Sequence, residues 1–177
     1  MSTSYSLAVN QVERIAQLCD FLEQPALLEV IKISIPVTMP ADIGSLGFDT
    51  GLWVGFGLVG LWSALDAFAE RSRIQNFRCA VCKRKGCLAS RLTNTGKVDA
   101  TAVVILRELE DLRHLFAHNF AGHADQAYFG MRRHAFQSSH PTTLSSGAAF
   151  DGSRVNLSAH HLHYYAKQSR AVLIRFA

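Results

Sequence analysis

The stretch from Gly51 to Leu65 limits the fold of this chain more than any other part of its sequence. It contains 15 residues, nearly all apolar, and Asp66 follows it. Because a helix that crosses a bilayer needs about 20 apolar residues, we do not expect a membrane span here. We predict instead a helix over residues 51–73 that is apolar nearly all round in its first half. Its glycines lower the helix propensity but let a neighbouring helix approach closely, at Gly51, Gly55, Gly57 and Gly60.

Periodic apolar positions predict three more helices. Residues 5–24 carry apolar side chains on one helical face, at Val12, Ile15, Cys19 and Leu22. Residues 98–119 carry an apolar stripe with spacing 4, 3, 4, at Ile105, Leu109, Leu112 and Phe116. Gly122 is a stop signal for that helix, and a last helix is expected over residues 157–175.

The segments between these helices carry weaker signals. Residues 26–37 fit either a helical turn or a short strand, and residues 41–50 and 76–96 are expected to be connections. Residues 123–156 are expected to be irregular, with room for a short β-hairpin. The predicted fold class is therefore all-α, an up-and-down bundle of four to five helices that forms a single domain over residues 1–177.

Charge is distributed unevenly along the chain. Residues 1–70 carry two basic and eight acidic side chains, whereas residues 71–177 carry sixteen basic and six acidic ones. Between residues 71 and 98 there are eight basic side chains and no acidic one. Such a segment attracts polyanions such as RNA, and it equally suits a solvated loop whose charge aids solubility. The expected RNA-binding side chains are Arg78, Lys83, Arg84, Lys85 and Arg91.

Composition excludes several classes of protein. With 49% hydrophobic and 18% charged residues, the chain is not expected to be disordered. Its four cysteines are too few for a disulfide scaffold. The first residues lack a basic stretch followed by an apolar run, so no secretory signal is expected. We therefore expect a soluble, cytoplasmic protein that makes no use of a membrane.

Gly55, Gly57 and Gly60 form a literal G-x-G-x-x-G pattern. The dinucleotide-binding version needs a strand directly before the pattern and an acidic residue about 20 positions later. Neither is expected here, since residues 76–84 carry only basic charges. Close helix packing explains the glycines better, and we expect no cofactor.

Three cysteines have a spacing that resembles part of a zinc site, Cys79-x2-Cys82-x4-Cys87. A structural zinc ion takes four ligands, so the fourth has to come from Cys19 or a histidine elsewhere in the fold. The alternative is a set of reduced cysteines in a basic loop, made somewhat reactive by the nearby positive charge.

All eight histidines lie after residue 113, and one pair has metal-ligand spacing. His114 and His118 are four residues apart, so they share a helical face and form an H-x3-H pattern. The metalloprotease version has Glu directly after the first His, where this chain has Leu115. The third ligand is also unspecified.

Arg113 and His118 offer a different chemistry. An imidazole that titrates near neutral pH and a permanent cation are what RNA cleavage without a metal requires. The imidazole accepts the 2′-hydroxyl proton or protonates the leaving 5′ oxygen, and the guanidinium stabilises charge on the phosphate. Five residues apart on a helix, the two side chains point about 140° from each other. The geometry therefore makes more sense at an interface where two copies face one another.

These residues resemble the hallmark of the HEPN domains, which is Arg, a polar residue, three variable residues and then His. Arg113-His114-x3-His118 fits this pattern with His in the polar position, and Asn119 and Gly122 add to the likeness. HEPN domains are helical bundles that commonly dimerise and so bring two motifs into one cleft. Many are metal-independent RNases that act in toxin–antitoxin, abortive-infection and related defence systems.

The resemblance implies a homodimeric endoribonuclease, a hydrolase of RNA with an antitoxin or another protein as a further partner. His118 would be the acid and base, Arg113 would stabilise the phosphate, and His114 and Asn119 would orient the site or contact the nucleotide. The expected products are a 2′,3′-cyclic phosphate and a 5′-hydroxyl. HEPN toxins silenced by AMP transfer have Tyr two positions after the His, and this chain has Phe120, so that neutralisation is not expected.

Three alternatives stay open at this point. The first is a non-catalytic HEPN bundle that binds RNA, a nucleotide or a protein partner. The second is a metal-dependent hydrolase built on His114 and His118. In the third, the motif is structural, with Arg113 paired to Glu110 and His118 capping the helix end.

Overall fold

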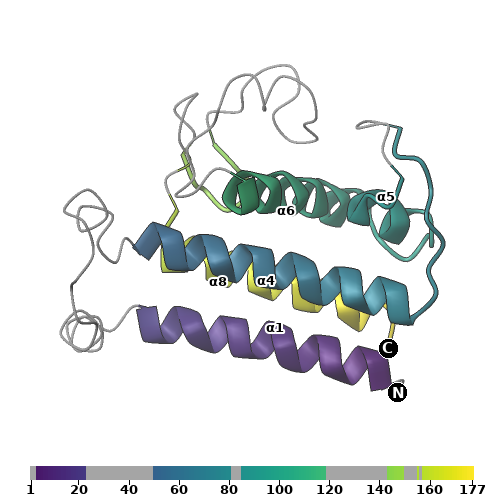
Figure 1. Cartoon of the computed structure of the whole chain (residues 1–177), viewed down its shortest axis with the longest axis horizontal. Coiled ribbons are helices and arrows are strands. Elements are labelled where there is room, and N and C mark those ends of the chain that lie inside the picture. The colour runs from purple at the N-terminus through teal and green to yellow at the C-terminus, as the bar shows by residue number, and fades with distance from the viewer. Residues whose placement is uncertain (1–2, 23–49, 81–84, 119–142, 150–154, 156) are drawn as a thin grey trace.

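The structure is a computed structural model that describes residues 3–22, 50–80, 85–118, 143–149, 155 and 157–177. The helices in this part of the chain are α1 (Thr3–Leu22), α4 (Thr50–Arg71), α5 (Leu88–Thr93), α6 (Ala100–His118) and α8 (Ala159–Ile174). The four long helices run alternately in opposite directions (Figure 1). The predicted all-α, up-and-down bundle is therefore confirmed. The predictions for residues 26–37, residues 41–49 and Gly122 lie outside the described residues.

Helix α4 lies at the centre of the bundle. It packs against each of the other four helices, and α1 and α6 lie on opposite sides of it (Figure 1). Helix α8 packs against both α1 and α4. One side of the apolar segment is buried as a consequence, with no exposed surface at Val54, Leu58, Leu61 and Leu65, whereas Phe56 is 54% exposed.

Three glycines of α4 lie against side chains of neighbouring helices. Gly55 faces the ring of Phe116 on α6, and Gly57 faces Leu162 on α8. A Cβ atom at either position would overlap these side chains, whereas one at Gly60 would lie 3.0 Å from the Cδ1 atom of Ile15 on α1. The interpretation of this glycine pattern as helix packing is confirmed, and each of three neighbouring helices meets α4 at one glycine.

The predicted apolar stripe of α6 is buried at all four of its positions, from Ile105 to Phe116. The same helix also buries an acidic residue, Glu108, which is 5% exposed. Its carboxylate accepts hydrogen bonds from the backbone N–H of Ser145 at 3.0 Å and from the Tyr165 hydroxyl at 2.9 Å. Burial, together with the Glu108 charge, raises the pKa of Tyr165. The phenol therefore stays protonated and keeps donating to Glu108.

The region expected to be irregular, residues 123–156, is described only at 143–149 and 155. There, Thr143 and Ala149 form a single antiparallel bridge around a tight turn. No strand is formed in this described piece, and the rest of the region lies outside the described residues. Ser145 in the turn is the residue that Glu108 holds, so the turn is tied to the middle of α6.

The predicted connection over residues 76–96 contains a helix that the sequence did not indicate, α5. Before it, α4 ends in two reverse-turn hydrogen bonds, from Arg73 N–H to Glu70 and from Ile74 N–H to Ala69. Arg73 adopts a left-handed conformation there, with φ of 54°, at the position where helix ends usually have glycine. In the described part of the chain, no helix combines the length and the apolarity that crossing a bilayer requires.

Candidate functional site

Arg113 lies five residues before the end of α6 and is held by two side chains. Its guanidinium carbon is 4.3 Å from the centre of the Trp62 ring on α4, a stacked cation–π contact. Its Nη1 atom is 3.0 Å from Nδ1 of His114. A contact between a cation and an indole face is worth about 0.5–2 kcal/mol, depending on how far water is excluded. Arg113 as a whole is half-buried, and these two contacts orient its guanidinium.

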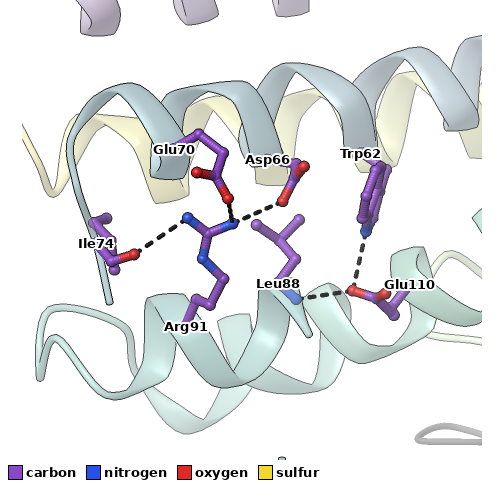
Figure 2. Close-up of polar contacts among 7 residues, drawn as sticks. All are labelled: Trp62, Asp66, Glu70, Ile74, Leu88, Arg91 and Glu110. Atoms are coloured by element: carbon purple, nitrogen blue, oxygen red, sulfur yellow. Dashed lines mark hydrogen bonds and ion pairs between the residues drawn. The ribbon is translucent and has the colours of Figure 1, made fainter. Parts of the chain in front are cut away.

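Glu110 is the buried acid beneath this arginine, with 6% of its surface exposed. Its Oε2 atom accepts hydrogen bonds from the indole N–H of Trp62 and the backbone N–H of Leu88, both at 3.0 Å (Figure 2). Its Oε1 atom lies 3.5 Å from Nε2 of His114. Burial would raise the pKa of Glu110, but the hydrogen bonds from His114 and Trp62 outweigh it and lower the pKa. Glu110 is therefore a carboxylate at neutral pH.

The proposed catalytic pair is described only in part. His118 is the last residue of α6, and its side chain lies outside the described residues, as do Asn119 and Phe120. The structure brings together Arg113 and His114, at the end of α6 that leads to His118. The role of Arg113 with His118, and the contribution of Asn119, stay predictions. The alternative in which Arg113 pairs with Glu110 for a structural reason differs in its contacts from the prediction. Arg113 and Glu110 are linked through Trp62 and His114, which both of them contact.

Two of the predicted RNA-binding residues lie opposite each other in the connection before α5. Arg78 and Lys85 are exposed and form a single antiparallel bridge. Lys83 and Arg84 belong to the intervening segment, which lies outside the described residues.

The structure gives Arg91 a different role from the predicted one. Only 1% of this residue is exposed, because its side chain is enclosed between α5 and α4 (Figure 2). Nη1 lies 3.0 Å from Asp66 and 2.9 Å from Glu70, and Nη2 donates to the carbonyl of Ile74 at 3.2 Å. A phosphate cannot reach this guanidinium in the folded protein. Arg91 is therefore removed from the set of RNA-binding residues and fastens α5 to the end of α4.

The enclosed position raises the pKa of the Asp66 carboxyl. Burial raises its pKa, the attraction of Arg91 lowers it, and the Glu70 and Glu110 carboxylates raise it again, with a net increase. The ion pair with Arg91 thus offsets only part of the free-energy cost of burying the charged form of Asp66.

The structure describes only some of the predicted metal ligands. Cys79 and Cys87 are both buried, and Cys82 between them lies outside the described residues. Among the residues that the structure does describe, no group of three His, Cys, Asp or Glu side chains is arranged to hold a metal ion. A zinc site that includes Cys82 and a metal site that includes His118 both stay untested predictions.

A separate groove of about 180 Å³ lies between α1 and α8. Its lining residues are Val12, Glu13, Ala16, His163, Ala166, Lys167 and Arg170. None of them is Arg113 or one of the residues around it, Trp62, Glu110 and His114. The nearby His161 accepts the backbone N–H of Ser158 at 2.9 Å, so it caps the start of α8.

Sequence reasoning missed Trp62, which contacts the guanidinium of Arg113, and named Glu110 only as a direct ion-pair partner of Arg113. One signal was available for Trp62, because an indole N–H in a predicted buried helix needs an acceptor. Glu110 precedes Arg113 by three residues on the same helix, a spacing that marks it as a neighbour. Neither signal identifies the pair, because α4 and α6 are 48 residues apart at this contact.

No protein-family model, no curated protein and no solved structure matches this chain. A function is therefore inferred from the chemistry of the site itself.

Proposed function

We propose that the chain is a metal-independent endoribonuclease of the HEPN type that acts as a homodimer. The observation that carries the proposal is the setting of Arg113, a half-buried residue whose guanidinium is held by Trp62 and His114. It lies at the end of α6 that terminates in His118, so a fixed cation and an imidazole belong to the same helix end. The all-α bundle is also the architecture that the resemblance implies.

His118 carries the proton transfers of the proposed reaction. As a base it takes the proton of the 2′-hydroxyl, the 2′ oxygen bonds to phosphorus, and the bond from phosphorus to the 5′ oxygen breaks. A protonated imidazole, from the second copy in a composite site, gives its proton to the leaving 5′ oxygen. Arg113 stabilises the negative charge on the non-bridging oxygens. The products are a 2′,3′-cyclic phosphate and a 5′-hydroxyl.

The surroundings of the reaction are part of the same proposal. Arg78 and Lys85, with Lys83 and Arg84 between them, supply the phosphate contacts that hold the RNA. A protein that cleaves cellular RNA needs restraint, so we place it in a toxin–antitoxin or defence setting in the cytoplasm, with an antitoxin as the second partner.

One observation favours a second candidate, a non-catalytic bundle that binds RNA, a nucleotide or a protein. Nη1 of Arg113 is engaged by His114, and one face of the guanidinium is covered by Trp62. Structural arginines are held in the same way. Under this candidate, the bundle keeps the exposed cations Arg78 and Lys85 but transfers no proton.

The experiment compares single variants of the whole chain on a mixed RNA substrate in EDTA. Arg113→Ala and His118→Ala are each expected to lower the cleavage rate at least about 100-fold. Acid–base catalysis by His118 contributes about 10²–10⁴, and one charge-stabilising donor such as Arg113 contributes about 10²–10³. The matched controls, Arg14→Ala on α1 and His163→Ala on α8, remove exposed side chains of the same two types and are expected to cleave normally. Unchanged cleavage by His118→Ala would overturn the mechanism.

Two further readouts separate the candidates. Mixing wild-type subunits with an excess of His118→Ala subunits is expected to lower the activity more than dilution alone would, because a mixed dimer has only one of the two imidazoles that the composite site needs. Wild-type protein that binds RNA in EDTA but produces no cyclic phosphate ends favours the non-catalytic bundle instead.

A further inference from the structure

Arg113 belongs to a closed circuit of contacts that returns to Glu110. Glu110 accepts the indole N–H of Trp62, the indole face carries the guanidinium of Arg113, and that guanidinium reaches His114. His114 in turn lies against the other oxygen of Glu110. One buried carboxylate therefore touches both side chains that hold the arginine.

The circuit specifies where the proton of His114 lies. A guanidinium has only donors, so Nδ1 of His114 has to be the acceptor in its 3.0 Å contact with Nη1 of Arg113. A neutral imidazole with an unprotonated Nδ1 carries its proton on Nε2. Nε2 is the nitrogen that lies 3.5 Å from Oε1 of Glu110, an oxygen that can only accept. The carboxylate therefore selects the tautomer that Arg113 needs.

We propose that Glu110 is a positioning residue for Arg113, which it orients through the His114 tautomer and the Trp62 indole plane. It contacts neither the RNA nor the reacting atoms. Its catalytic consequence rests on the proposed function, whereas its effect on His114 and Arg113 does not. The hydrogen bonds from Trp62 and Leu88 fix the position of the Glu110 carboxylate. The fixed carboxylate in turn fixes His114 and the Trp62 ring, and these two side chains orient the guanidinium of Arg113.

Glu110→Gln tests this role with little change in size. The amide oxygen can still accept from Trp62 and Leu88, which leaves the amide NH2 group facing Nε2 of His114. Two donors then face each other, so the imidazole has to move its proton to Nδ1. An Nδ1–H group points its hydrogen at the donors of Arg113, and the contact between them is lost. The expected result is a reversed tautomer of His114 in long-range proton–nitrogen NMR spectra.

The kinetic readout follows from a misplaced guanidinium. We expect kcat for RNA cleavage to fall about 10–100-fold while KM changes less than about threefold, since a small misplacement costs up to about 100-fold in rate. The matched control is Glu108→Gln, which alters a second buried carboxylate of α6 with hydrogen bonds to Ser145 and Tyr165. It is expected to lower stability while leaving the His114 tautomer and kcat unchanged.

The outcomes distinguish this proposal from the proposed function. If wild-type protein cleaves RNA and Glu110→Gln leaves the His114 tautomer or kcat unchanged, the positioning role is overturned and the proposed function stands. If wild-type protein cleaves no RNA, the proposed function fails. The tautomer in Glu110→Gln then still decides whether Glu110 positions Arg113, with reversal supporting it and no change overturning it.

Discussion

Gly57 gives a sharp test of how closely the helices of this bundle pack. In Gly57→Ala, the new Cβ atom overlaps the side chain of Leu162, which is fully buried on α8. In Gly60→Ala, three residues along the same helix, the new Cβ atom lies 3.0 Å from one terminal methyl group of Ile15, which is only half-buried and is able to rotate away.

Two contributions of opposite sign determine how much each variant changes the free energy of unfolding. Alanine has a higher helix propensity than glycine by about 1 kcal/mol. Inserting a methyl group into a filled core costs about 1–3 kcal/mol. Gly60→Ala gains mostly the first term, whereas Gly57→Ala has both, for a net loss of stability of up to about 2 kcal/mol. Because the propensity term cancels between them, the two variants should differ by about 1–3 kcal/mol.

The assay is urea unfolding of both variants and the wild type, followed by circular dichroism. In a heating experiment each kcal/mol corresponds to about 2–4 °C for a chain of this length. A second cycle adds Leu162→Val, which makes room for the methyl group, and the combined variant should lose less stability than the sum of the two single variants. Equal stability of Gly57→Ala and Gly60→Ala would refute the close approach of α4 and α8.

The remaining predictions concern buried charge. Arg91→Ala should lower the free energy of unfolding, because it leaves Asp66 without its counter-charge under α5. The loss should lie toward the lower end of about 3–5 kcal/mol, since the Asp66 side chain is 28% exposed, and a loss below about 1 kcal/mol in urea unfolding would contradict it. The pKa of Glu110 is lowered from 4.5, so its stabilising contribution is present above that pH and is lost as the pH falls through the lower folded value. Glu110→Gln should therefore flatten the acid side of the stability curve measured by urea unfolding, although Asp66, whose pKa is raised, contributes the opposite slope in both proteins.

The long helices were predictable because their signals are local. The stripe from Ile105 to Phe116 and the apolar face of α1 follow the helical period, and the structure buries the stripe together with Val12 and Cys19 of α1. Helix α5 was missed because it has six residues, which is too short for a periodic pattern. It is held instead by contacts with distant parts of the chain, above all by Arg91.

Arg91 shows why local charge was a poor guide. The count of basic residues in its segment predicts an exposed cation, and at Arg78 and Lys85 the structure agrees. Its acidic partner Asp66 lies 25 residues away in sequence, and only the packing of α5 on α4 brings them together. At the candidate site, the motif located Arg113 and His114, and Glu110 is their neighbour on the same helix. The indole of Trp62 comes from α4, so its contact with Glu110 depends on the same kind of distant pairing.

The packing of α8 against both α1 and α4 has a consequence for the nascent chain. Arg170 of α8 donates to Glu13 of α1 across 157 residues of sequence, so this contact has a very high contact order. While the ribosome is still making the residues that precede α8, α1 and α4 expose the apolar faces that α8 later covers. Such an open half-bundle is the stage at which aggregation competes with folding, and a chaperone would act there. Closure of the bundle is thus a late, single event in the life of the chain.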